Sequence, residues 1–236
     1  MSYKNIAVVC AFVLALCVGV GYVKSSTKSR KVQAAEPEQR GALRQQIAKA
    51  KSKGEAHLNL PGLVANYEQV KDLEDALSRY TVVIGQLIEV KSYISEQDSV
   101  TSWYKFKVLD NVFQPAVSKS LDFIHPPAEL LPLNDDEILI PRIGGTLSVD
   151  GISVVRSEQG FSAFEKSNKY LLFVLLDNVT KVGLPDLGVA GVLTVTDDDS
   201  LVSVNNQMLI LEKELKSRYG ETLPKIKEGL RGERGK

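Results

Sequence analysis

From residue 80 onward the hydrophobic side chains recur at every second position, and this period of two constrains the fold more than any other feature of the sequence. In the run YTVVIGQLIEVKSYI, residues 80 to 94, Ile88 and Val90 alternate with charged residues. Such alternation is typical of a β-strand with one buried face. We therefore predict a strand over this run. Its expected core positions are Val82, Ile84, Ile88 and Val90.

Seven further short runs with turn signals between them are predicted as strands. They lie at 101–109, 137–143, 146–149, 152–155, 170–176, 188–195 and 201–204. One of them, YLLFVLL at 170–176, is apolar throughout and suits a central strand buried on both faces. Gly85 predicts a bulge or bend of the kind found at barrel corners. Asp150-Gly151 supplies the positive φ angles of a type I′ hairpin turn. The spacing predicts a small antiparallel β-barrel or sandwich, with residues 111–136 as a long loop.

Helical periodicity flanks the predicted barrel on both sides. Val70, Leu73 and Leu77 form an apolar stripe in a helix expected over 66–79, with Asn66 as its cap. Two helices are expected over 206–230, the first capped by Asn206 and the second by Thr222. The fold class is therefore mainly β with flanking helices (α+β). We expect one globular domain over 62–236, with the β-barrel at 80–205.

An uncharged apolar segment, IAVVCAFVLALCVGVGYV, occupies residues 6–23. At about 1.5 Å per residue it is roughly 27 Å long as a helix, which nearly spans a bilayer core. We predict that residues 1–24 form one transmembrane anchor in the lipid bilayer; a cleaved signal peptide and a buried core helix are the alternatives. Residues 25–61 read as a polar, basic linker with a solvated stalk helix over 42–53, and a basic helix near a membrane can contact anionic headgroups.

The charges of the chain limit its partners and its location. Lys plus Arg and Asp plus Glu each number 29, so the formal net charge is zero. A nucleic-acid partner is not expected, because such binding usually needs a basic field. The positive-inside rule, counted strictly, places the domain in the cytoplasm, but large domains override that count. We expect a single-pass membrane protein with an extracytoplasmic domain, in the bacterial periplasm or at the cell surface.

The segments VVIGQLIEVKS, WYKFKVLDNV, IPRIGGTLSVDGI and KYLLFVLL occur in this order between residues 80 and 205. Together they resemble a recurrent β domain of uncharacterised exported or membrane-anchored bacterial proteins. The resemblance implies an OB-like or netrin-like barrel and no known activity.

Short motifs give no catalytic constellation. Ser102 and Lys105 match the S-x-x-K nucleophile motif, but that motif requires a helix, and positions three apart in a strand point to opposite faces. His57 and His125 lack neighbouring ligands at metal-site spacing. The acidic runs 134–137 and 197–199 lack the alternation of a calcium loop. We assign no catalytic, cofactor-binding or metal-binding residue and expect no cofactor.

Trp103 is the aromatic residue with the best claim to a binding role. It lies on a predicted strand, where alternation places it on the face opposite Tyr104 and Phe106. An exposed tryptophan there could stack on a sugar, peptide or base. The alternative is a core position.

The expected function is a membrane-anchored module that binds or scaffolds an envelope component, with an unknown protein or glycan as partner. One alternative is an envelope hydrolase acting on peptide or glycan, with Asp110, Asp135 or Asp136 in acid–base roles. Carboxylates that converge in a cleft would favour that alternative. A second alternative is a cytoplasm-facing tethered adaptor.

Overall fold

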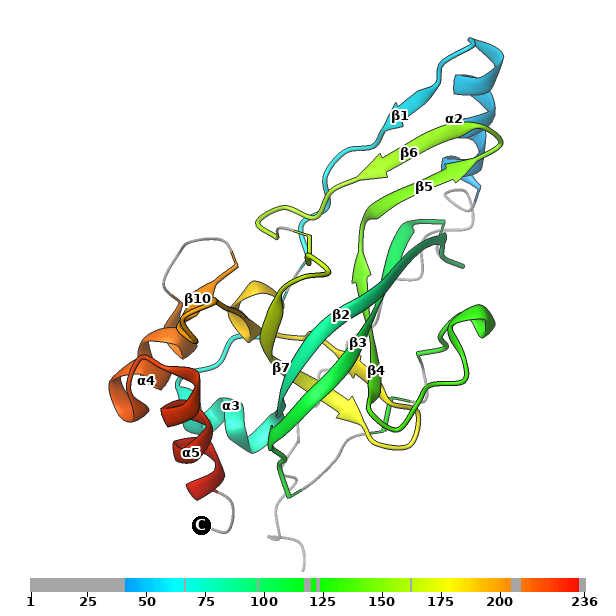
Figure 1. Ribbon diagram of the computed structural model, residues 1–236. Helices are drawn as coiled ribbons and strands as arrows, with labels where there is room; N and C mark the ends of the chain where they lie inside the picture. Colours follow the sequence, from blue (N-terminus) through cyan, green and yellow to red (C-terminus); the bar gives the residue numbers. More distant parts are fainter. Residues whose placement is uncertain are drawn as a thin grey trace, which may run out of the picture. The chain divides into compact units, whose positions relative to one another are not determined.

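The alternating strands close into a five-stranded β-barrel (Figure 1). In order around the barrel the strands are β7 (Lys169–Asp177), β2 (Thr81–Ile94), β3 (Val100–Phe113), β4 (Glu137–Ile143) and β8 (Val182–Leu184). Strand β8 pairs back with β7 and so closes the ring. The β4–β8 pair is parallel, and the other neighbours are antiparallel. The prediction of a small, mainly β barrel with flanking helices is confirmed.

The computed structural model describes residues 41–65, 67–96, 98–116, 120–121, 124–161, 163–204 and 209–233. All of them belong to one of two units of the chain, the unit that spans residues 36–236. Several predicted features lie outside the described residues. They are the anchor at 6–23, the linker at 25–40 and the helix caps Asn66 and Asn206. None of the described helices is both long and apolar enough to cross a membrane.

A second, three-stranded sheet has the order β1 (His57–Asn59), β6 (Ile152–Arg156) and β5 (Gly145–Val149). The expected hairpin joins β5 to β6, and both turn residues have positive φ, 51° at Asp150 and 83° at Gly151. Helix α2 (Ala42–Ser52) packs on this sheet. The prediction that this helix is a solvated stalk is therefore wrong, because Leu43, Ile47 and Ala50 are buried in an apolar cluster shared with the sheet.

Three helices cover the outer face of β2 and β7: α3 (Leu73–Arg79), α4 (Ile210–Tyr219) and α5 (Leu223–Gly232). The predicted helix over 66–79 is shorter than expected. It begins only after Asp72, whose carboxylate accepts the Asp75 N–H at the helix start, while the Glu68 N–H bonds to the Asp186 carbonyl. Thr222 occupies the N-cap position of α5, as predicted, but its side chain makes no capping hydrogen bond. Helix α4 begins after Leu209.

Strand β7 carries two cores at once. Leu171, Phe173 and Leu175 pack beneath the helices, and Leu172 and Val174 point into the barrel. This two-sided burial confirms the prediction made from the continuous apolar run. Strands β9 (Val192–Val195) and β10 (Leu201–Ser203) extend the sheet from β7. Residues 188–191, predicted as strand, form a 3₁₀ turn, η3, and a second 3₁₀ turn, η2, spans Ala128–Leu130.

Of the four core positions predicted on β2, two are confirmed and two are wrong. Val82 and Ile84 are fully buried, but Ile88 and Val90 are 39% and 40% exposed. Val82 and Ile84 pack beneath the helices on the outer face of β2, and Ile88 and Val90 lie outside that apolar cluster. Leu87 points into the barrel, on the same face as Val83.

Candidate functional site

A hollow of about 500 Å³ opens at the end of the barrel where β3 leaves β4. We call it the barrel-mouth pocket. Its lining consists of Val83, Val108, Leu109, Asp110, Asn111, Asp135, Asp136, Glu137, Ile138, Leu176, Asn178 and Lys181. Val83 and Ile138 belong to the barrel core, so the pocket has an apolar floor and a rim of polar and charged groups. This combination is typical of small-ligand and peptide sites.

The pocket brings together the three carboxylates that the sequence had nominated, Asp110, Asp135 and Asp136. Helix α5 holds the first of them. Arg231 Nη2 donates to both carboxylate oxygens of Asp110 at 2.8 Å, and Lys227 forms a second ion pair with it. Partial burial raises the pKa of Asp110, but the hydrogen bonds from Lys227 and Arg231 outweigh burial and leave that pKa below its usual value. Asp110 therefore stays ionised at neutral pH.

Asp135 is fixed by the turn between β7 and β8. Lys181 Nζ lies 2.9 Å from its carboxylate and also donates to the carbonyl of Asp135 at 3.2 Å. The hydrogen bond from Lys181 lowers the pKa of Asp135. Lys181 itself has a φ of 55°, a left-handed conformation that ends the turn before β8.

Asp136 and Glu137 complete the acidic side of the rim. Lys107 Nζ lies 3.6 Å from the Asp136 carboxylate. Glu137 accepts hydrogen bonds from the backbone N–H and the side-chain amide of Asn134, at 2.9 and 2.8 Å. The backbone hydrogen bond lowers the pKa of Glu137 despite its burial. Each carboxylate of the rim thus has a cationic or amide partner.

This arrangement suits recognition better than acid catalysis. A general acid at neutral pH needs a raised pKa, which burial or a like charge supplies. In this pocket the pKa values of Asp110, Asp135 and Glu137 are all lowered. The rim therefore offers ionised oxygens, which accept hydrogen bonds from hydroxyl, amide or ammonium groups of a ligand.

The S-x-x-K pair has a structural role. Ser102 is buried, lies 2.8 Å from the Ser92 hydroxyl and donates to the Gly144 carbonyl at 2.7 Å. Lys105 lies between Glu89 and Glu137, at 3.7 and 3.9 Å. The hydroxyl of Ser102 holds the bend at residues 144–145, and the ammonium group of Lys105 balances carboxylates.

Trp103 is buried, with 7% of its surface exposed, and packs with Leu130, Leu139 and Val182. Leu130 belongs to η2, so the loop predicted at 111–136 covers part of the Trp103 side chain. The hypothesis that Trp103 is an exposed stacking residue is therefore wrong, and the alternative that it occupies a core position is confirmed. Tyr104 and Phe106 point into the barrel, as the alternation predicted.

Both histidines and the second acidic run lie on the surface. His57 on β1 and His125 are exposed. The run 197–199 forms the turn between β9 and β10, where Asp198 accepts the Ser200 N–H at 3.2 Å. Among the described residues, no group of three or more His, Cys, Asp or Glu side chains is placed to hold a metal ion.

The sequence reasoning missed a buried charged pair at the opposite end of the barrel. Arg142 on β4 donates to Glu158 from Nε at 3.1 Å and from Nη2 at 2.7 Å, and Nη2 also donates to the Tyr67 hydroxyl. Phe161 covers the guanidinium, with the ring centroid 3.2 Å from Cζ. The signal was present in the pattern, since Ile138, Ile140 and Arg142 alternate on β4 and the first two are core residues.

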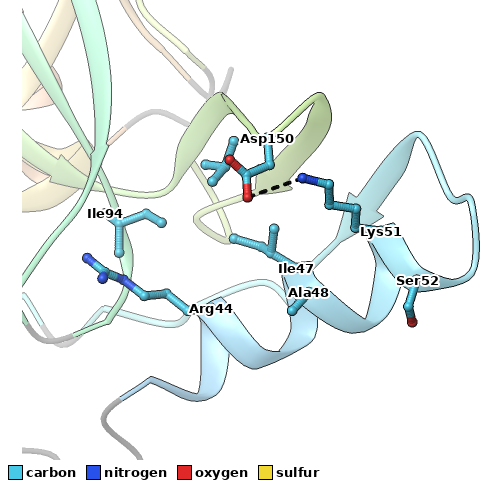
Figure 2. A pocket seen from close by; sticks show the side chains of 8 residues that line it. Arg44, Ile47, Ala48, Lys51, Ser52, Ile94 and Asp150 are labelled. Atoms are coloured by element: carbon cyan, nitrogen blue, oxygen red, sulfur yellow. Dashed lines mark ion pairs between the residues drawn. The ribbon is translucent and has the colours of Figure 1, made fainter.

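A second missed feature is a groove along α2, of about 580 Å³, shown in Figure 2. We call it the α2 groove. Its lining consists of Arg44, Ile47, Ala48, Lys51, Ser52, Ile94, Val149 and Asp150. It escaped notice because the stalk interpretation left α2 without a neighbour.

Comparisons of the chain with protein-family models, with curated proteins and with solved structures gave no significant match. The functional argument therefore rests on the geometry of these sites.

Proposed function

We propose that this chain is a non-enzymatic, membrane-anchored module that binds an envelope component, protein or glycan, through the barrel-mouth pocket. The observation that carries the proposal is the rim of that pocket. It gathers Asp110, Asp135 and Asp136 around an apolar floor, and each carboxylate has a cation beside it. Ionised acceptors over an apolar floor favour a ligand rich in hydrogen-bond donors.

The tether is the second part of the proposal. Residues 6–23 are uncharged and apolar, with Lys4 before them and Lys24 after them. Their length favours a single span in the bilayer. The proposed location of residues 36–236 is extracytoplasmic, in a bacterial periplasm or at the cell surface.

The barrel itself is compatible with an OB-like module. Five strands with one parallel closing pair, β4 with β8, are consistent with a small Greek-key barrel. Barrels of this kind bind extended ligands with strand faces and loops rather than in a sealed interior. Here Phe164 contacts Tyr104, Phe106 and Tyr170 edge to face inside the barrel, so the interior is packed.

An envelope hydrolase is the second candidate, and one observation favours it: all three nominated carboxylates do line one pocket. A cytoplasm-facing adaptor is the third. Protease digestion of the domain in cells distinguishes an extracytoplasmic from a cytoplasmic location. Digestion when the outer barriers are open and the inner membrane is intact supports the extracytoplasmic location. Protection until the inner membrane is broken supports the adaptor.

Binding is tested with a photo-crosslinking side chain at Asn178, an exposed residue on the pocket rim. We expect crosslinked adducts in intact cells that disappear in a double variant, Asp135→Asn with Asp136→Asn. The matched control is Asp197→Asn with Asp199→Asn, on the exposed β9–β10 turn. Adducts that persist in the first variant would contradict the pocket assignment. A measured hydrolysis that Asp110→Asn abolishes in a folded protein would favour the hydrolase.

A further inference from the structure

The α2 groove has a cationic rim over an apolar floor. Arg44, Ala48, Lys51 and Ser52 follow one another at helical spacing, so they form one stripe along α2. Ile94 of β2 and Val149 at the end of β5 face this stripe. In Figure 2 the Arg44 side chain extends toward Ile94, and Lys51 extends toward Asp150.

The cations of α2 are only partly neutralised. Lys51 Nζ lies 3.6 Å from Asp150, and both side chains are more than half exposed. Lys53 lies 3.6 Å from Glu55, also at the surface. Exposed pairs of this kind contribute little and exchange readily with other anions. Within the described ranges Arg44 and Lys49 have no ion-pair partner.

Helix α2 contains no acidic residue. Asp98 accepts the Leu43 N–H at 2.6 Å and so caps the start of the helix. Four basic residues, Arg44, Lys49, Lys51 and Lys53, are exposed on or directly after α2. The surface is therefore complementary to a layer of negative charge rather than to a single anion.

The position of α2 in the chain identifies which anionic layer is within reach. It is the first described element after the apolar segment, and 17 residues, 24 to 40, separate the two. Seventeen residues reach at most about 60 Å when fully extended. The barrel-mouth pocket lies at the other end of β2, since Val83 lines the pocket and Ile94 lines the groove. The 14 residues of β2 separate the two ends by on the order of 40 Å.

We propose that the α2 groove docks on anionic phospholipid headgroups of the bilayer that holds the anchor. In this docking Arg44 and Lys51 contact headgroup phosphate, and Ile94 and Val149 contact the glycerol region beneath it. The proposal rests on the proposed function for the presence of the anchor. It adds an orientation, because docking of α2 directs the barrel-mouth pocket away from the membrane.

The test uses the full chain reconstituted in vesicles, with Cys10→Ala and Cys17→Ala as background and a fluorophore at Ser52→Cys in the groove. A nitroxide on the lipid headgroup quenches the fluorophore at close range. We expect stronger quenching in vesicles with 30% phosphatidylglycerol than in pure phosphatidylcholine, and loss of this difference at high salt. A fluorophore at Val179→Cys, on the 90% exposed residue of the β7–β8 turn, is the distant control.

The charge variant is Arg44→Glu with Lys51→Glu, and the matched control is Lys213→Glu with Lys225→Glu on exposed positions of α4 and α5. Each cation near an anionic surface adds roughly fivefold to membrane affinity. We therefore expect the first variant to lose the lipid-dependent quenching and the control to keep it. Equal quenching in both lipids, or quenching of Val179→Cys alone, would overturn the docking.

Vesicle flotation separates failure of the docking from failure of the anchor. A chain that floats with both lipids but shows no lipid-dependent quenching refutes the docking and leaves the anchor. Flotation only with anionic vesicles, lost in the Arg44→Glu and Lys51→Glu variant, refutes the anchor and supports the docking. A chain that floats with neither lipid refutes both.

Discussion

Arg142 and Glu158 form a two-bond ion pair that is almost completely buried, with 2% and 3% of the side chains exposed. The pair joins strand β4 to the chain that follows β6. Burial lowers the pKa of Arg142 to about 9 and raises the pKa of Glu158 to about 7. Removal of either partner leaves the other in a poorly solvated site. The remaining carboxyl group of Glu158 can take up a proton and become neutral, whereas the remaining guanidinium of Arg142 stays charged.

Glu158→Gln should be strongly destabilising. The guanidinium of Arg142 would remain charged and buried, stacked on Phe161, with its Nη1 already unpartnered among the described residues. Breaking a buried pair from one side typically costs about 3–5 kcal/mol. Urea unfolding of the purified chain in detergent measures the change. A loss below about 1 kcal/mol, within the range of exposed pairs, would show that the pair is not buried.

Arg142→Met should give a stability that depends on pH. Without its cation, Glu158 keeps a pKa raised by burial above the unfolded value of 4.5. The folded state then binds the proton more tightly, so stability is fully present below about pH 4.5 and is lost as pH rises through about 7. A shift of this size corresponds to about 3 kcal/mol. Unfolding at pH 5 and pH 8 checks the sign, and equal stabilities at the two pH values would contradict it.

The barrel could be predicted from the sequence because its signals are local. The period of two in β2 and β3, the Asp150-Gly151 turn and the apolar run of β7 each specify their own element. Strand β8, with three residues, and strand β1 carry no such pattern, and both form because a neighbouring strand offers an edge. The predicted helix that contains α3 was too long. The segment before Asp72 makes tertiary contacts instead, such as the hydrogen bond from the Glu68 N–H to the Asp186 carbonyl.

The sequence named Asp110, Asp135 and Asp136 only as acid–base candidates of an alternative hydrolase, and it did not predict the partners that these carboxylates have. Their cations come from distant parts of the chain, since Arg231 lies 121 positions from Asp110 and Lys181 lies 46 positions from Asp135. Such pairs depend on tertiary packing, which sequence spacing does not reveal.

Leu87→Ala and Ile88→Ala test which side chain of this part of β2 belongs to the barrel core. Leu87 is 2% exposed within the barrel, whereas Ile88 is 39% exposed. We expect a loss of about 2–5 kcal/mol for Leu87→Ala. The loss for Ile88→Ala should stay near 1 kcal/mol or less, because little apolar area leaves water at that position. The reverse order in chemical denaturation would contradict the placement of Leu87 in the barrel core.

Asp110→Asn should loosen α5 and remove an acid-sensitive contribution to stability. The folded-state pKa of Asp110 lies below its unfolded value of 3.8, so its contribution is present above pH 3.8 and is lost as pH falls through the folded pKa. Its partners lie near the surface, and we expect about 1 kcal/mol. Hydrogen exchange of α5 at pH 6 should be faster in the variant. Once the pH falls below the folded-state pKa of Asp110 the two proteins should converge, and a difference that persists there would assign the effect to packing.

Gly145→Ala and Gly151→Ala separate steric clash from backbone strain at the two ends of β5. Both glycines have positive φ, 133° and 83°. A Cβ at Gly145 would lie 1.9 Å from Ser102 Oγ and 2.6 Å from Ser92 Oγ, whereas a Cβ at Gly151 meets no atom within 4 Å. We expect about 1–2 kcal/mol for Gly151→Ala from strain alone.

The loss for Gly145→Ala should be clearly larger, because its φ belongs to a region that only glycine adopts easily and the new methyl group would displace the Ser102 hydroxyl from the Gly144 carbonyl. Thermal unfolding of both variants measures the difference. Ser102→Ala combined with Gly145→Ala should recover part of the loss, since it removes the clashing oxygen. If the double variant recovers nothing, the backbone at 145 rather than the serine contact sets the requirement for glycine.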